Sequence, residues 1–301
     1  MNDSQPEGLA SLPFHHVDVF ATRPYSGNSL AVFPAAAGLS AAQMGLITRE
    51  MRHFESIFLQ PGDGDHDWHA RVFDLSEELD FAGHPLIGAA CVLHSLQGTS
   101  GGEQWLIRTP ARRAEIRTER RGPARFEAVL DQGIAEFLAG PGLPAGADIA
   151  SWFSLVEADL DPVLAPEVIS TGLRYLVLPV RGDALARARI KVTDLGVRLA
   201  QLGAQFAYLL DARGIEARHW SNDGLIEDVA TGSGAGCAAA YLRRHGLLGD
   251  GETARLRQGR LAGRPSEIVI RAHGTGPSIR SVEVGGEVVL LGEGRLHALP
   301  A

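Results

Sequence analysis

Several features that define other protein classes are scarce or missing in this chain of 301 residues. Two cysteines are too few for a disulfide framework, so a reducing compartment is the default expectation. No apolar run approaches the ~18–20 residues of a membrane-spanning helix, and the N-terminus lacks the basic start and apolar stretch of a secretory signal. We therefore expect a soluble cytoplasmic protein that does not bind membranes.

Basic charge is also in short supply, with 28 Lys and Arg against 36 Asp and Glu and a formal net charge of −8. This balance argues against nucleic acid as a main partner, because phosphate binding needs concentrated Lys and Arg. No spacing predicts a zinc site: His15 and His16 are too close together, and His66 and His69 lie in a loop rich in Gly and Asp.

What is present is an ordinary globular balance, with 45% hydrophobic and 21% charged residues. The length corresponds to about two domains of ~150 residues each. The 36 glycines indicate many tight turns, or backbone brought close to a ligand.

Short strands outnumber helices in the predicted elements, which favours an α+β fold over a doubly wound parallel sheet. Four helices are predicted: 41–52 with Ser40 as N-cap, 85–96, 192–202 and 235–245. Near the C-terminus, Gly285-Gly286 is predicted to be a hairpin turn between strands 281–284 and 287–291. The other predicted strands are 14–20, 30–33, 56–60, 68–75, 106–109, 114–118, 126–131, 175–180, 206–211, 216–220 and 267–272.

Two segments of the chain resemble each other, residues 78–90 (ELDFAGHPLIGAA) and residues 226–238 (IEDVATGSGAGCA). Gly83 and Gly232 are 232 − 83 = 149 positions apart, about half the chain, which is the spacing expected of a duplicated domain. Each segment brings a polar side chain, His84 or Ser233, to a helix N-terminus, where unpaired N–H groups and the helix dipole favour anions. The alternative is that both glycines only permit close packing and both polar residues only cap helices; the matched pair of motifs favours a site.

Further stretches lie in the same order across almost the whole chain, and together with the two segments they resemble the PhzF-like phenazine biosynthesis family. The stretches are Val17–Phe20, Gly27-Asn28, Ala31–Phe33, Phe54–Phe58, Phe81–Pro85, Glu227–Ser233 and Gly263–Ser266. The resemblance implies the diaminopimelate epimerase-like fold, with two similar α+β domains, each a mixed barrel-like sheet around a central helix. We expect one domain over 12–126, completed by about 288–301, and the other over 127–287.

The resemblance also implies an active site between the domains, a homodimer, and no metal or organic cofactor. The catalytic residues of the family correspond here to Glu55, His84, Asp228 and Ser233. The expected substrate-binding residues are Asn28, Gly83, Thr231 and Gly232. One departure is Val229, where the family commonly has proline; it leaves the catalytic side chains in place and affects the expected substrate more than the reaction type.

The chemistry of the candidate residues fits acid/base catalysis. Glu55 lies among apolar residues, where desolvation raises the pKa of a carboxyl toward neutrality; without the motif it would be interpreted as an exposed charge at a helix end. At a helix start, the charged form of His84 is disfavoured, so its imidazole can donate or accept a proton. Asp228 could hold a substrate amine or orient His84, or could simply be a helix-start carboxylate.

Two other site types are less well supported by the sequence. Gly232–Gly236 resembles a dinucleotide loop, but polar residues precede it, whereas such loops follow an apolar strand. A two-thiol racemase would need its cysteines at the helix starts. Cys91 and Cys237 lie 8 and 5 residues past the two loop glycines, more than one helical turn inside.

We therefore expect a cofactor-independent isomerase, in which Glu55 moves a proton within a small carboxylate substrate. The alternatives are a binding protein for small acids that has lost the chemistry, and a racemase of amino or hydroxy acids, which needs two opposed bases.

Overall fold

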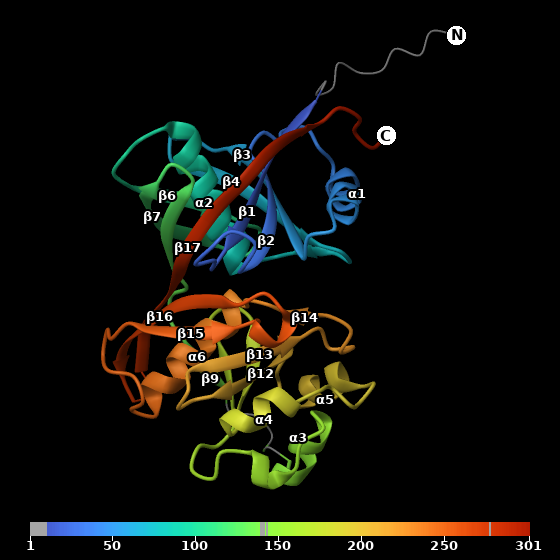
Figure 1. Ribbon diagram of the computed structural model, residues 1–301, viewed down its shortest axis with the longest axis vertical. Coiled ribbons are helices and arrows are strands. Elements are labelled where there is room, and N and C mark those ends of the chain that lie inside the picture. The colour runs from blue at the N-terminus through green and yellow to red at the C-terminus, as the bar shows by residue number, and fades with distance from the viewer. Residues whose placement is uncertain (1–10, 139–141, 143, 277) are drawn as a thin grey trace. The chain divides into compact units, whose positions relative to one another are not determined.

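The computed structural model describes residues 11–138, 142, 144–276 and 278–301. The chain forms two compact units (Figure 1). Unit 1 runs to Leu130 and also takes in Glu287–Ala301, and unit 2 is Asp131–Gly286. The domain boundaries predicted from the sequence stay a prediction.

In unit 1 a mixed sheet closes into a barrel. The strands pair in the ring β1-β2-β3-β4-β6-β7-β8-β17, and β17 pairs again with β1. β2–β3 and β4–β6 are the parallel pairs, and the short β5 adds to β4. The bounds are β1 Leu12–Val19, β2 Asn28–Phe33, β3 Glu55–Pro61, β4 Asp67–Asp74, β5 Glu78–Leu79, β6 Gly102–Arg108, β7 Arg113–Gly122, β8 Arg125–Asp131 and β17 Ser278–Leu296.

Two helices of unit 1 use different faces of this sheet. The helix α2 (Gly83–Gln97) is buried along most of its length and packs against β1, β2, β3, β6 and β7, so it is the central helix of the barrel (Figure 1). Its glycine Gly88 lies directly against Leu30 of β2. The helix α1 (Ala41–Met51) packs on β3 and β4 from the other side, around Met44 and Phe58. The predicted N-cap Ser40 is confirmed, within a capping box with Gln43.

Unit 2 has the same plan. Its strands pair in the order β9-β10-β11-β12-β13-β15-β16-β17, and backbone hydrogen bonds between residues 132–135 and 279–282 connect the two ends. The helix α6 (Gly232–Arg244) packs against β10, β11, β12 and β16. The strands are β9 Glu136–Leu138, β10 Glu167–Ser170, β11 Arg174–Pro179, β12 Phe206–Asp211, β13 Glu216–Trp220, β14 Glu227–Asp228, β15 Ala254–Gln258 and β16 Ser266–Thr275.

The order and direction of pairing repeat between the units. β1–β2, β2–β3, β3–β4 and β4–β6 are antiparallel, parallel, antiparallel and parallel, and so are β10–β11, β11–β12, β12–β13 and β13–β15. In each unit a two-residue strand, β5 or β14, then leads into the central helix. The glycine-helix echo in the sequence therefore belongs to a repeated supersecondary structure.

The predicted hairpin at Gly285-Gly286 is wrong, because both glycines lie inside the 19-residue strand β17, where Gly285 pairs with Val269. A two-residue turn of this kind needs a positive φ, and neither residue has one. The chain reverses earlier, where Gly274 and Gly276 have φ of 133° and 53°.

The other differences concern the covering helices of unit 2. The helix predicted over 192–202 is the shorter α5 (Leu195–Gln201), because Val192 instead packs outside the helix against the hydrophobic core. The helices α3 (Gly146–Trp152) and α4 (Gly182–Arg187) were not predicted; both are short and form only where their apolar side chains meet that core. Two 3₁₀ turns, Glu157–Asp159 and Arg260–Ala262, complete the structure.

Candidate active site

Glu55 is the first residue of β3 and is 7% exposed. The interpretation as an exposed helix-end charge is therefore wrong: α1 ends at Met51, and the chain enters the sheet after it. Side chains alternate along a strand, so Glu55 shares a face with Ile57, opposite to Phe58 beneath α1. This face is the inner one, which contacts α2.

His84 meets Glu55 at the start of the central helix. α2 begins at Gly83, and Nδ1 of His84 lies 3.5 Å from Oε2 of Glu55. Both side chains are buried, at 5% and 10% exposure, so the structure brings together in unit 1 a carboxyl and an imidazole that are 29 positions apart. This separation is longer than the roughly 2.6–3.2 Å of a direct proton transfer, and contacts of this kind tighten when a substrate is bound.

Asn28 joins the same region of unit 1. It begins β2, is 2% exposed, and lies two residues before Leu30, which pairs with Glu55 and faces α2. Strand alternation therefore places the Asn28 amide on the inner face, where it can bind a polar substrate group.

In unit 2, Asp228 ends the short strand β14 and is held in a fixed orientation. The hydroxyl of Thr231 donates to its Oδ2 at 2.6 Å, and the backbone N–H of Ala230 donates to Oδ1 at 3.2 Å. Asp228 is 5% exposed, and it lies in the strand before α6 rather than in the first turn of that helix. The helix-start interpretation of this carboxylate is therefore wrong.

Gly232 and Ser233 open α6 as Gly83 and His84 open α2. The residues before them, Ala82 and Thr231, make no side-chain capping bond. Because Ala82 and Thr231 occupy the N-cap positions, His84 and Ser233 lie inside the first helical turn and are not the capping residues of their helices. The hydroxyls of Ser233 and Tyr175 on β11 instead lie 2.9 Å apart.

A buried glutamine that the sequence analysis missed organises this part of unit 2. Nε2 of Gln258 donates to the Asp228 carbonyl and to Oγ1 of Thr231, at 2.7 and 2.9 Å. Its Oε1 accepts from the Tyr208 hydroxyl at 2.8 Å and from the Thr231 N–H at 3.2 Å. Gln258 therefore fixes the loop that carries Asp228. A single polar residue at a strand end gave no signal in the sequence.

His219 was also missed, because it is a lone histidine in a predicted strand. It pairs directly across from Asp228 in the β13–β14 ladder and is 6% exposed. The aromatic rings of Tyr175, Phe206 and Tyr208 surround it.

The two cysteines lie inside the central helices, as predicted. Both are completely buried, and burial raises the pKa of the Cys91 thiol strongly and that of Cys237 to about 12. Thiolate chemistry near neutral pH is therefore disfavoured at both positions.

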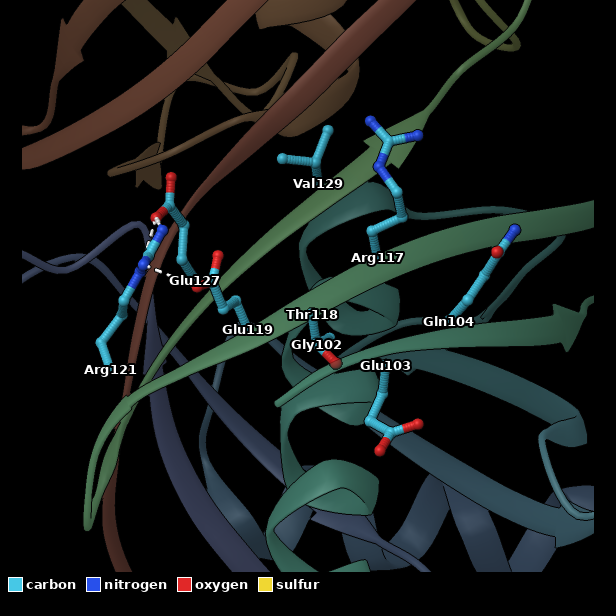
Figure 2. A pocket seen from close by; sticks show the side chains of 9 residues that line it. All are labelled: Gly102, Glu103, Gln104, Arg117, Thr118, Glu119, Arg121, Glu127 and Val129. Atoms are coloured by element: carbon cyan, nitrogen blue, oxygen red, sulfur yellow. Dashed lines mark hydrogen bonds and ion pairs between the residues drawn. The ribbon is translucent and has the colours of Figure 1, made fainter. Parts of the chain in front are cut away.

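A hollow on the β6-β7-β8 part of unit 1 contains none of the candidate residues (Figure 2). Arg121 bridges Glu119 and Glu127 there, through side chains that are largely open to solvent. Within the described part of the chain, no group of three or more His, Cys, Asp or Glu side chains could hold a metal ion. No helix among the described residues is long and apolar enough to cross a membrane.

Comparison with known proteins places these features in a family. The barrel sheet with helices is shared with a hydroxyproline epimerase from Agrobacterium vitis, at a TM-score of 0.64 and 14% identity over 95% of this chain and 92% of that one. The chain itself belongs to the phenazine biosynthesis-like (PhzC-PhzF) family, whose model matches residues 17–294. The family predicted from the motifs is thus confirmed.

The curated relatives place the chain among isomerases. Trans-2,3-dihydro-3-hydroxyanthranilate isomerase of Pseudomonas fluorescens is 32% identical over 93% of this chain and 97% of the relative. An uncharacterised isomerase of Escherichia coli K12 is 29% identical over 92% and 95%. A solved structure from Pseudomonas aeruginosa, described as a predicted epimerase, has a TM-score of 0.89 and 49% identity over 95% of this chain and 99% of that one.

Proposed function

We propose that this isomerase moves a proton within a small carboxylate substrate, and that Glu55 carries the proton. The observation that supports this most is the buried Glu55–His84 pair at the start of the central helix, with 3.5 Å between Oε2 and Nδ1. A buried carboxyl with an imidazole beside it suits proton transfer near neutral pH.

The proposed step is an internal transfer that needs no other reactant. The Glu55 carboxylate takes a proton from a carbon next to an unsaturated or carboxylated centre, and the C–H electron pair moves into the substrate's π system. Glu55 then returns a proton to the far end of that system, and its carboxyl proton can exchange with solvent before that return. His84 stabilises the transient negative charge or relays a second proton, so bonds broken and formed balance within the substrate.

We further propose that the two sets of residues form one site between two domains. Asp228 and Ser233 would position the substrate, and the backbone N–H groups at Gly83 and Gly232 would bind its anionic groups. Thr231 holds Asp228, and Asn28 contacts the substrate. These roles rest on the family resemblance and on the geometry inside each unit. The homodimer is part of the proposal and is tested by light scattering.

The substrate of the curated relatives is the first compound to test, trans-2,3-dihydro-3-hydroxyanthranilate. In D₂O, the wild-type protein is expected to move a proton of this or a related cyclic acid and to introduce deuterium at carbon, as followed by NMR. Glu55→Gln keeps the shape of the side chain but cannot carry the proton, so exchange should fall at least 10³-fold. Glu50→Gln, on the exposed surface of α1, is the matched control.

Exchange that persists in a folded Glu55→Gln variant contradicts the role of Glu55. Tight binding of the acid without exchange in the wild type supports the binding-protein alternative. A racemase is the second candidate, favoured by the 49% identical structure described as a predicted epimerase. It would use the same first step, but its product would be the mirror-image acid instead of a shifted double bond.

A further inference from the structure

His219 lies on the inner face of the unit 2 sheet with the candidate residues. Directly opposed residues of an antiparallel pair direct their side chains to the same face, and His219 is opposite Asp228. The ring contacts Tyr175, with 5.6 Å between centroids, and the Tyr175 hydroxyl reaches Ser233 at the start of α6. His219, Asp228 and Ser233 are therefore grouped at one end of the central helix.

The ring is fixed by one hydrogen bond that also sets its tautomer. Nδ1 of His219 lies 2.9 Å from the carbonyl oxygen of Ala207. The pairing between β12 and β13 begins at Leu209, which is opposite Arg218. Ala207 therefore has no paired residue in β13. A carbonyl oxygen only accepts hydrogen bonds, so Nδ1 must carry a proton.

The remaining ring nitrogen is then a hydrogen-bond acceptor. Burial lowers the pKa of His219 below its ordinary value, and the nearby Asp228 opposes this only in part. The imidazole is therefore neutral near pH 7, and with the proton on Nδ1 its Nε2 has a lone pair. No hydrogen bond among the described residues reaches Nε2, and this atom is not among the fully buried polar atoms without a partner, so a ligand or water can reach it.

The repeated fold of unit 1 shows that a polar side chain at the position of His219 is not required to build the barrel. The register of unit 1 places Val72 opposite Leu79, just as His219 stands opposite Asp228 in unit 2. Val72 is completely buried and apolar. The same fold position thus accepts a hydrocarbon, whereas in unit 2 it presents an acceptor that no group among the described residues satisfies.

We propose that His219 is a specificity-determining residue that accepts a hydrogen bond at Nε2 from a hydroxyl or amino group of the substrate. This inference rests on the proposed site and deepens it, because it limits the substrate to a carboxylate that also carries a hydrogen-bond donor. A bound ligand that covers Nε2 without offering a donor leaves this lone pair unsatisfied, and this is a strong means of discrimination in binding sites.

The first test needs no ligand. Long-range ¹H–¹⁵N NMR of the full chain at pH 7.5, with the His219 signal identified by its loss in a variant, should show a neutral ring with its proton on Nδ1. A ring that is doubly protonated, or protonated on Nε2 alone, would overturn the proposal.

The second test distinguishes a role of His219 in ligand recognition from a role in supporting the fold. The probes are 3-hydroxyanthranilate and its two deletion analogues, anthranilate without the hydroxyl and 3-hydroxybenzoate without the amine. In the wild type at least one deletion should weaken binding tenfold or more, as measured by calorimetry. His219→Asn keeps a donor near the Nδ1 position but removes Nε2, so it should fold normally and lose that preference to within threefold.

His219→Gln supplies the converse variant, because its amide reaches the Nε2 position but abandons Ala207. It should restore part of the preference while lowering the melting temperature. A purely structural His219 predicts the reverse order, with Asn equal to wild type in selectivity. That result, or a wild type that binds none of the probes or has no preference among them, contradicts the proposal. His245→Gln is the control, since His245 contacts Glu167 outside this group.

The two proposals can fail separately. Loss of proton exchange in all assays, with His219-dependent selectivity intact, would remove the isomerase mechanism and leave the recognition role. Normal exchange that depends on Glu55, with selectivity unchanged in His219→Asn, would do the opposite.

Discussion

Arg218 holds Glu227 through two parallel hydrogen bonds, from Nε to Oε1 at 2.8 Å and from Nη2 to Oε2 at 2.7 Å. Unit 1 repeats this pair with Arg71 and Glu78, and the two glutamates are 227 − 78 = 149 positions apart, the same offset as the loop glycines. In both units the pair joins the short strand before the central helix to its neighbour. Glu227 thereby anchors the strand that carries Asp228.

The two pairs should differ in their contribution to stability. The Arg218 side chain is 4% exposed, whereas Arg71 and Glu78 are 34% and 29% exposed. Glu227→Gln leaves a buried cation without its partner and should cost roughly 3–5 kcal/mol in the free energy of unfolding. Glu78→Gln should cost at most about 1 kcal/mol. Urea unfolding measures both, and equal losses would contradict the burial argument.

The cysteines should be dispensable for activity and unreactive in the folded protein. Complete burial keeps both as thiols, since it raises both pKa values. The double variant Cys91→Ala, Cys237→Ala should keep most of its activity, apart from any loss of stability, and iodoacetamide should not inactivate the wild type. Complete loss of turnover in the folded double variant would favour thiol chemistry over the Glu55 mechanism.

Two helix glycines should respond in opposite ways to substitution by alanine. A Cβ at Gly88 would lie 2.5 Å from Leu30 and 3.0 Å from Val19, so Gly88→Ala should cost about 1–3 kcal/mol through overpacking. At Gly45 in α1 the nearest atom is 3.6 Å away, on the Arg49 side chain. Gly45→Ala should therefore stabilise the protein by about 0.5–1 kcal/mol. Thermal melts of both variants test this, and a shift of the same sign in both would refute it.

Stability should fall as the pH falls through the histidine range. Burial lowers the pKa of His94 below its ordinary 6.5, so its ring stays neutral in the folded protein while the unfolded chain takes up a proton. The stabilisation is complete above about pH 6.5 and is lost between that value and the lower folded-state pKa. His15 and His219 shift in the same direction. Between pH 7.5 and 5.5, the melting temperature of His94→Leu should fall less than that of the wild type. An equal fall would show that His94 does not contribute to the pH dependence of stability.

The positions of many strands along the chain could be predicted from the sequence, because they depend on local patterns. The strands 206–211 and 216–220 have the predicted bounds, since each alternates or is apolar between turn residues. The helix at Ser40 was marked by its capping residue. The hairpin predicted at Gly285-Gly286 was wrong because the dipeptide pattern is local, whereas the course of β17 is set by pairing with distant strands.

The candidate site was predictable only where a motif carried it. Glu55 and His84 were identified from the family pattern, but their 3.5 Å contact depends on the parallel pairing of β2 with β3 around α2. Gln258 and His219 have no motif; strand register places His219 beside Asp228, and tertiary hydrogen bonds place Gln258 there. The catalytic and binding roles of all these residues stay predictions until the experiments above are done.

The path of β17 has a consequence for how the chain folds during its synthesis. Unit 2 is one continuous segment, Asp131–Gly286, but the ring of unit 1 is closed by residues 288–296 at the far end of the chain. Domains usually fold in the order in which the ribosome releases them. Here unit 1 is synthesised first, but its barrel stays open between β1 and β8 until residues 288–296 are available. Unit 2 can therefore complete its folding before unit 1.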